Sequence, residues 1–121
     1  KIMKIIALHG GMRGFDIPGA IFVITGDLRL YQNEYERNTL FVDGGIFLMN
    51  LLYALDSLGL VACPLIWGSE PSDDKKLSEI LNIKPHEKIV AWISAGYCPG
   101  KAFKAAISSK RDLNTILRII E

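Results

Sequence analysis

The stretch DGGIFLMNLLYALDSLGLVACPLIWG, residues 43–68, decides the fold of this chain. Its first part, Gly44–Leu58, is apolar all round, so a helix formed there must be buried on every side. We expect this helix to begin at Thr39 or Asp43 and to end at Leu58, with Gly59 as its carboxy-terminal cap. Leu60–Cys63 then predicts a short strand that Pro64 interrupts.

The rest of the chain offers little protein to cover such a helix. With 121 residues, the chain is one domain by length. The segment Gly44–Leu58 would reach only about 22 Å, which is too short to span a bilayer. We therefore predict that a second copy of the chain covers the helix, and that the turn after it faces a ligand.

The composition argues against several classes of partner. Fourteen basic and 13 acidic side chains give a net charge of +1, which favours neither nucleic acid nor an anionic membrane. No signal peptide or apolar run of 18 residues is present, and Cys63 and Cys98 are interpreted as free thiols rather than a disulfide, which together predict a cytoplasmic location. His9 and His86 have no partner at metal-ligand spacing, so no metal site is expected.

The flanking segments predict two more strands and three more helices. The strands are apolar runs with many β-branched residues, Gly19–Thr25 and Glu87–Ser94. The helices are Lys1–Leu8, Pro71–Leu81 and Leu113–Ile120. Between them, Leu28–Arg37 is expected to be a loop with a helical turn.

Several residues predict where these elements stop. The helix stops are Gly10-Gly11 after the first helix and Asn82 after Leu81. The strand stops are Gly26-Asp27 and Gly96-Tyr97. Asp112 is expected to cap the last helix.

This order of elements resembles the carboxy-terminal part of the nitroreductase family. The pieces that carry the resemblance are Asp43-Gly44-Gly45, Met49–Leu52, Leu58–Leu65, Leu81–Glu87, Ile89–Ser94, Gly96-Tyr97 and Ser108–Arg111, which together cover most of residues 19–121. The resemblance implies an α+β fold with a mixed, mainly antiparallel sheet flanked by helices. It also implies that residues 1–121 form a single nitroreductase-like domain, that the long central helix lies at a homodimer interface, and that the amino-terminal part of the family fold is absent.

The same resemblance implies a flavoenzyme. Family members bind flavin mononucleotide (FMN) between subunits and pass hydride from NAD(P)H to nitro compounds, quinones or related small-molecule acceptors. Pro64, Leu65, Ile66 and Trp67 lie where the family contacts the isoalloxazine ring, and Lys110 and Arg111 fit the basic pair that contacts the FMN phosphate. Position 66 is often polar in the family but is Ile here.

Each of these sites also has a structural interpretation. The Pro64–Trp67 turn would equally suit a hydrophobic turn in a dimer core, with Trp67 as core packing, and Lys110-Arg111 would suit a solvated basic turn. The alternative function is a non-catalytic nitroreductase-like remnant that dimerises or binds a small ligand. A third hypothesis, a nucleotide-binding regulator, rests on the glycine-rich loop Gly10–Gly14 with Arg13. The sequence contains no recognisable pair of a nucleophile and a general base, so no catalytic residue is predicted.

Overall fold

A three-stranded antiparallel sheet with the strand order β1-β3-β2 forms the centre of the protein. In this computed structural model the described residues are 2–12, 14–98, 100 and 109–120. The strands are β1 (Ala20–Asp27), β2 (Leu60–Leu65) and β3 (Glu87–Tyr97). The longest strand, β3, lies in the middle and pairs with both neighbours. The described sheet therefore contains antiparallel pairs only.

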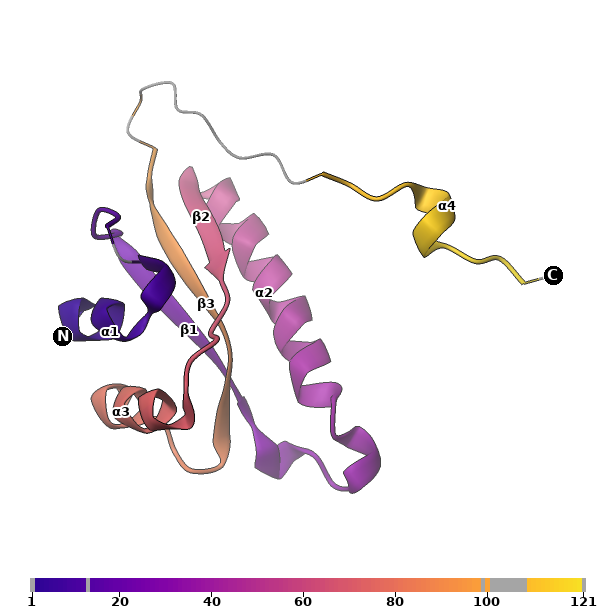
Figure 1. The fold of residues 1–121 in the computed structure, drawn as a ribbon, viewed down its shortest axis with the longest axis horizontal. Coiled ribbons are helices and arrows are strands. Elements are labelled where there is room, and N and C mark those ends of the chain that lie inside the picture. Colours follow the sequence, from indigo (N-terminus) through magenta and orange to yellow (C-terminus); the bar gives the residue numbers. More distant parts are fainter. Residues whose placement is uncertain (1, 13, 99, 101–108, 121) are drawn as a thin grey trace.

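Helices cover both faces of this sheet (Figure 1). Helix α2 (Thr39–Ser57) packs on one face, where Leu55 joins Ile24, Ile93 and Ala95 in a buried cluster. Helices α1 (Ile2–Leu8) and α3 (Pro71–Leu81) lie on the other face, where Ile5 and Leu77 surround Trp92. Because neighbouring residues of a strand point to opposite faces, Trp92 and Ile93 belong to different clusters.

Helix α2 approaches the sheet closely at Gly44. A Cβ atom placed on Gly44 would lie 2.5 Å from Cγ1 of Val90. Val90 lies where the β1–β3 register shifts, opposite the junction of Ile24 and Thr25. A residue without a side chain is therefore needed at position 44 to let the helix and the bulged strand meet.

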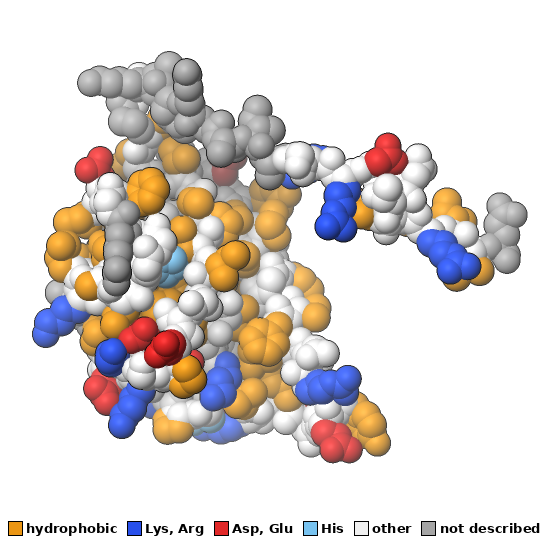
Figure 2. Space-filling view, viewed as in Figure 1, with side chains coloured by type: hydrophobic (Ala, Val, Ile, Leu, Met, Phe, Trp, Pro, Cys, Tyr) orange, Lys and Arg blue, Asp and Glu red, His pale blue; other side chains and the backbone are white. Residues whose placement is uncertain are grey.

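The described residues of one chain leave much of α2 exposed, so the expected burial on every side is not met within a single copy. Only Leu40, Gly44 and Leu55 are buried. Val42, Ile46, Met49 and Tyr53, spaced four, three and four residues apart, form one stripe on the face opposite the sheet, and they are 45–68% exposed. Figure 2 shows hydrophobic side chains along the course of α2. We call these four residues the α2 stripe.

Helix α2 is longer than the segment Gly44–Leu58 from which the sequence estimate of its length was made. With 19 residues, α2 is long and apolar enough by length and composition to cross a bilayer, as the core helices of soluble proteins also are. One side of α2 packs against a sheet whose two outer strands have unpaired edges. A bilayer interior does not accommodate such open edges, so packing rather than length favours a protein environment for this helix.

Most predicted elements are present, but several predicted ends are wrong. Strand β1 continues through Gly26-Asp27, β2 continues through Pro64, and β3 continues through Gly96 to Tyr97. Gly10–Met12 forms a short 3-10 helix (η1) instead of a left-handed stop, and two more 3-10 helices, η2 (Leu28–Leu30) and η3 (Glu34–Glu36), occupy the predicted loop. The last helix, α4 (Leu113–Ile116), is shorter than predicted, although Asp112 caps it by accepting a hydrogen bond from the backbone NH of Asn114.

Candidate functional site

The turn that follows β2 lines a cleft beside the end of α1. The cleft has a volume of about 420 Å³, and its lining residues come from two segments: His9, Gly10 and Gly11 after α1, and Pro64, Leu65, Ile66, Gly68 and Ser69 at and after the end of β2. We call it the His9 cleft. Its volume lies in the range of about 300–1,000 Å³ typical of small-ligand sites.

Pro64 and Leu65 are the last residues of β2, and they bring the following turn to the cleft. Pro64 pairs in register with Ile93 and Leu65 with Trp92, so the strand continues to the edge of the cleft. Proline is tolerated there because β2 is an edge strand and only one of its sides pairs with a neighbour. Beyond Leu65 the chain leaves the sheet, and Ile66 is 89% exposed. Three of the four residues predicted for the flavin-facing turn, Pro64, Leu65 and Ile66, therefore line one cleft.

Trp67, the fourth residue, faces the protein interior. Its ring stacks on Trp92 with centroids 4.7 Å apart and planes inclined by only 6°, and its indole NH donates a hydrogen bond to Asp74. It also packs against the buried cluster around Leu77. Trp67 therefore packs against the core, and it does not line the His9 cleft as Pro64, Leu65 and Ile66 do.

His9 is the residue that the sequence did not identify as part of a site. Its side chain is 6% exposed, and its ring lies 5.1 Å from the ring of Trp92 and 6.0 Å from that of Trp67, measured between centroids. Among the described residues, neither ring nitrogen has a hydrogen-bond partner. The only signal in the sequence is a histidine placed between an amphipathic helix and a Gly-Gly pair, which does not by itself indicate a site.

Lys110 and Arg111 lie outside this cleft. Both are exposed, and they precede α4 in a segment that Figure 1 shows apart from the sheet. The structure therefore does not bring the basic pair together with Pro64–Ile66 within one chain. Ser108, at the start of the last piece of the resemblance, and Arg13 of the glycine-rich loop lie outside the described residues.

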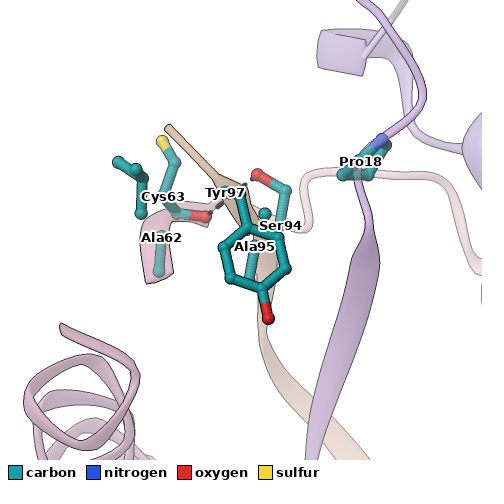
Figure 3. A pocket seen from close by; sticks show the side chains of 8 residues that line it. Pro18, Ala62, Cys63, Ser94, Ala95 and Tyr97 are labelled. Carbon is teal, nitrogen blue, oxygen red and sulfur yellow. Dashed lines mark hydrogen bonds between the residues drawn. The ribbon is translucent and has the colours of Figure 1, made fainter. Parts of the chain in front are cut away.

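A second cleft lies on the sheet between β2 and β3 (Figure 3). It has a volume of about 310 Å³ and is lined by residues that include Pro18, Cys63, Ser94 and Tyr97. The Ser94 hydroxyl donates to the carbonyl oxygen of Cys63 over 3.5 Å, which is long for such a bond. Neither histidine lines this cleft, so its described lining contains no pairing of nucleophile and imidazole base.

A broader groove runs between α2 and β1. Its volume is about 890 Å³, and Tyr31, Asp43 and Phe47 contribute to its lining. The Tyr31 hydroxyl donates to a carboxylate oxygen of Asp43 over 3.0 Å. Burial, followed by this hydrogen bond, raises the pKa of Tyr31. The hydrogen bond joins the loop before α2 to the helix.

Comparisons with known proteins agree with this architecture. The sequence matches the model described as Nitroreductase family over residues 9–97. A solved Bacillus subtilis structure assigned as a nitroreductase is 14% identical, with a TM-score of 0.78, covering 98% of this chain and 72% of that chain. An FMN-dependent nitroreductase from Clostridium difficile R20291 is 19% identical, with a TM-score of 0.70, covering 93% of this chain and 65% of that chain.

A third similar structure contains a flavin. It is a protein from Desulfovibrio desulfuricans, assigned as a nitroreductase and solved in complex with FMN, which is 23% identical with a TM-score of 0.68. The match covers 93% of this chain and 60% of that chain. A search of curated proteins gave no match. The chain thus spans between 60% and 72% of the lengths of these three solved proteins.

Proposed function

This chain belongs to the nitroreductase family, and from that premise we propose that it acts as, or as part of, an FMN-dependent oxidoreductase. The proposed reaction passes hydride from NAD(P)H to a nitro compound, a quinone or a related small-molecule acceptor. We place the flavin ring in the His9 cleft. When bound, FMN would supply the two-electron chemistry, and the protein would supply binding, orientation and exclusion of water.

The observation that carries this proposal is the convergence of Pro64, Leu65 and Ile66 on one cleft of suitable size. An apolar wall of this kind suits the face of a flat ring system, and the backbone NH groups of Gly10, Gly11 and Gly68 offer donors for its polar edge. Ile66 has no polar side-chain atom, so any hydrogen bond at that position comes from the backbone.

The phosphate group needs a cationic partner, and we propose Lys110 and Arg111 for this role. A guanidinium and an ammonium form short, charge-assisted hydrogen bonds with phosphate oxygens. Both side chains are exposed and lie outside the His9 cleft in one chain. A basic pair from a second copy of the chain would fit a site formed between subunits.

We also propose that the working unit is a cytoplasmic homodimer formed through the α2 stripe. Four apolar side chains opposite the packed face of α2 are exposed, and no other described element packs on that side. A second α2 related by a two-fold axis would present the same stripe and so cover it. This arrangement would give the helix the all-round burial that its sequence predicts.

Flavin binding tests the proposed function directly. The purified chain is titrated with FMN and its absorbance followed, and NADH or NADPH is then added without oxygen. We expect a yellow complex that bleaches with reductant and recovers its colour when a quinone is added. A colourless chain that neither takes up FMN nor responds to NAD(P)H would overturn the oxidoreductase proposal.

The non-catalytic module is the second candidate function. It is favoured by the separation of Lys110 and Arg111 from the cleft and by the apolar Ile66. It predicts a stable dimer that takes up no FMN, so light scattering combined with the FMN titration distinguishes it from the flavoenzyme.

A further inference from the structure

His9 combines tight packing with unused hydrogen-bonding capacity. Its backbone is fixed by two hydrogen bonds, from its NH to the carbonyl of Ile6 and from the NH of Met12 to its own carbonyl, each 3.0 Å long. Its imidazole is 6% exposed, and neither Nδ1 nor Nε2 has a hydrogen-bond partner among the described residues. Buried polar atoms normally have partners, and among the described side chains only His9 and its neighbour Trp92, at Nε1, depart from this rule. His9 differs from Trp92 in that it lines a cleft.

Packing alone does not account for a histidine at this position. The ring lies beside the stacked pair Trp67 and Trp92, where a phenylalanine would make similar aromatic contacts without burying two polar atoms. Leaving buried polar atoms without partners lowers folding stability, whereas an apolar replacement of the same shape removes that cost. A residue that weakens the fold at the edge of a cleft is typical of a functional site.

The neighbouring glycine preserves space beside the ring. A Cβ atom on Gly11 would lie 3.2 Å from Cε1 and 3.4 Å from Nδ1 of His9. A larger residue at position 11 would therefore press on this edge of the imidazole. Gly11 and His9 both line the His9 cleft, so the space left by the missing side chain of Gly11 is part of that cleft.

We propose that His9 is a ligand-binding residue, whose imidazole hydrogen-bonds the polar edge of a planar heteroaromatic ring lying against Pro64–Ile66. This inference rests on the proposed function, under which the ring is the flavin. A rotation of the imidazole about its Cβ–Cγ bond changes which ring atoms face the cleft, and binding then satisfies a nitrogen that has no partner among the described residues.

Two variants of His9 separate ligand binding from packing. His9→Phe keeps the aromatic shape and removes both nitrogens, and His9→Gln retains a donor and an acceptor. His86→Phe is the matched control, since His86 is the other histidine of the chain and lies next to Asp27 instead of the cleft. All three are made in the full chain, and their thermal melting is recorded.

Riboflavin and FMN serve as the two probes. Riboflavin carries the flavin ring without the phosphate, so it reports ring contacts alone, and FMN adds the contacts proposed for Lys110 and Arg111. The two tryptophans of the chain, Trp67 and Trp92, stack together beneath the cleft, so their fluorescence should be quenched by a bound flavin. Tryptophan emission then measures binding independently of enzyme activity.

We expect His9→Phe to melt at the same or a higher temperature than the wild type and to bind both probes about tenfold more weakly, as the loss of one hydrogen bond predicts. His9→Gln should recover part of that affinity, and His86→Phe should bind as the wild type does. Equal affinity of His9→Phe and wild type would overturn the inference and leave the proposed function intact. A wild-type chain that binds neither probe would overturn both.

Discussion

Gly44 and Gly45 are adjacent residues of α2 with opposite surroundings. A Cβ atom on Gly44 would meet Val90, with Cγ1 at 2.5 Å and Cγ2 at 3.0 Å, whereas a Cβ atom on Gly45 would have nothing within 4 Å. Val90 is β-branched and has few rotamers with which to avoid the contact. The sequence motif Asp43-Gly44-Gly45 thus contains one glycine that packing requires and one that it does not.

We therefore predict opposite effects of the same substitution at these two sites. Gly45→Ala should raise the free energy of unfolding by up to about 1 kcal/mol, because alanine has the higher helix propensity. Gly44→Ala should lower it by about 1–2 kcal/mol, because the cost of overpacking exceeds that gain. Urea denaturation of both variants measures the difference, and equal stabilities would show that α2 does not approach β3 this closely.

Asp27 controls the acid sensitivity of the turn after β1. Its carboxylate accepts hydrogen bonds from the side chain and the backbone NH of Arg29, with His86 3.9 Å away. The side-chain hydrogen bond from Arg29, followed by the backbone one, lowers the pKa of Asp27 from 3.8 to about 2. The folded chain therefore binds this proton less readily than the unfolded chain does.

The sign of the pH effect follows from this lowered pKa. The stabilising contribution of Asp27 should be complete above about pH 4 and should disappear as the pH falls toward about 2. In Asp27→Asn, which keeps a side-chain oxygen for the turn, the free energy of unfolding should fall less steeply over that window. Arg29→Gln should have the same effect, and parallel stability curves for wild type and Asp27→Asn would contradict the prediction.

At the scale of elements, α3 shows what local sequence can determine. Pro71 occupies the first turn, acidic side chains follow it at Asp73 and Asp74, and Asn82 adopts the left-handed conformation with φ of 60° and ψ of 38°. Each of these features depends on residues within one turn of the helix end. Both ends of α3 could therefore be predicted from the sequence.

Asn82 provides a test of that local control. Asn82→Ala should lower the free energy of unfolding by about 1 kcal/mol, since a side chain with a Cβ but no local hydrogen bond is strained in the left-handed region. Asn82→Gly should be neutral or slightly stabilising. Thermal melting of the two variants compares them, and equal losses would indicate that the hydrogen bond from Lys84 to the Asn82 side chain, rather than backbone conformation, is the contribution that matters.

The strand ends were harder to predict because they depend on neighbours that are distant in sequence. Pro64 predicts an interruption of the strand, but β2 is an edge strand and tolerates a proline. Gly96 likewise predicts the end of a strand, but β3 pairs with a neighbour on both sides and continues to Tyr97. Strand order is a property of the assembled sheet, and hydrophobic pattern alone does not contain it.

The residues of the candidate site also differ in how well the sequence alone could predict them. The resemblance in the sequence grouped Pro64, Leu65 and Ile66 in one turn, and they line one cleft, while their contact with a flavin stays a prediction. His9 could not be predicted, because the case for it rests on two ring nitrogens that have no partner among the described residues and on its position beside a segment more than fifty residues away. The placement of Trp67 was ambiguous for the same reason, since its partner Trp92 is supplied by the central strand.

At the scale of the whole molecule, α2 raises the question of what covers its outer face. Its sequence predicts burial all round, yet Val42, Ile46, Met49 and Tyr53 are 45–68% exposed in one chain. An exposed apolar stripe of this regularity is typical of an interface. In the homodimer that we propose, a second copy would cover the stripe with the same four residues, and Lys110 and Arg111 of one copy would lie near the cleft of the other.

We predict that the chain elutes and scatters light as a dimer, with twice the 13.4 kDa mass of one chain. The double variant Ile46→Glu/Met49→Glu should weaken dimerisation at least about 100-fold, because it places unpaired charges in a buried interface. Phe15→Glu is the control, since Phe15 is 76% exposed and lies outside the α2 stripe, and it should remain dimeric. If the wild type and the double variant were both monomers with equal stability, the outer face of α2 would have no role in self-association, and a site shared between subunits would lose its physical basis.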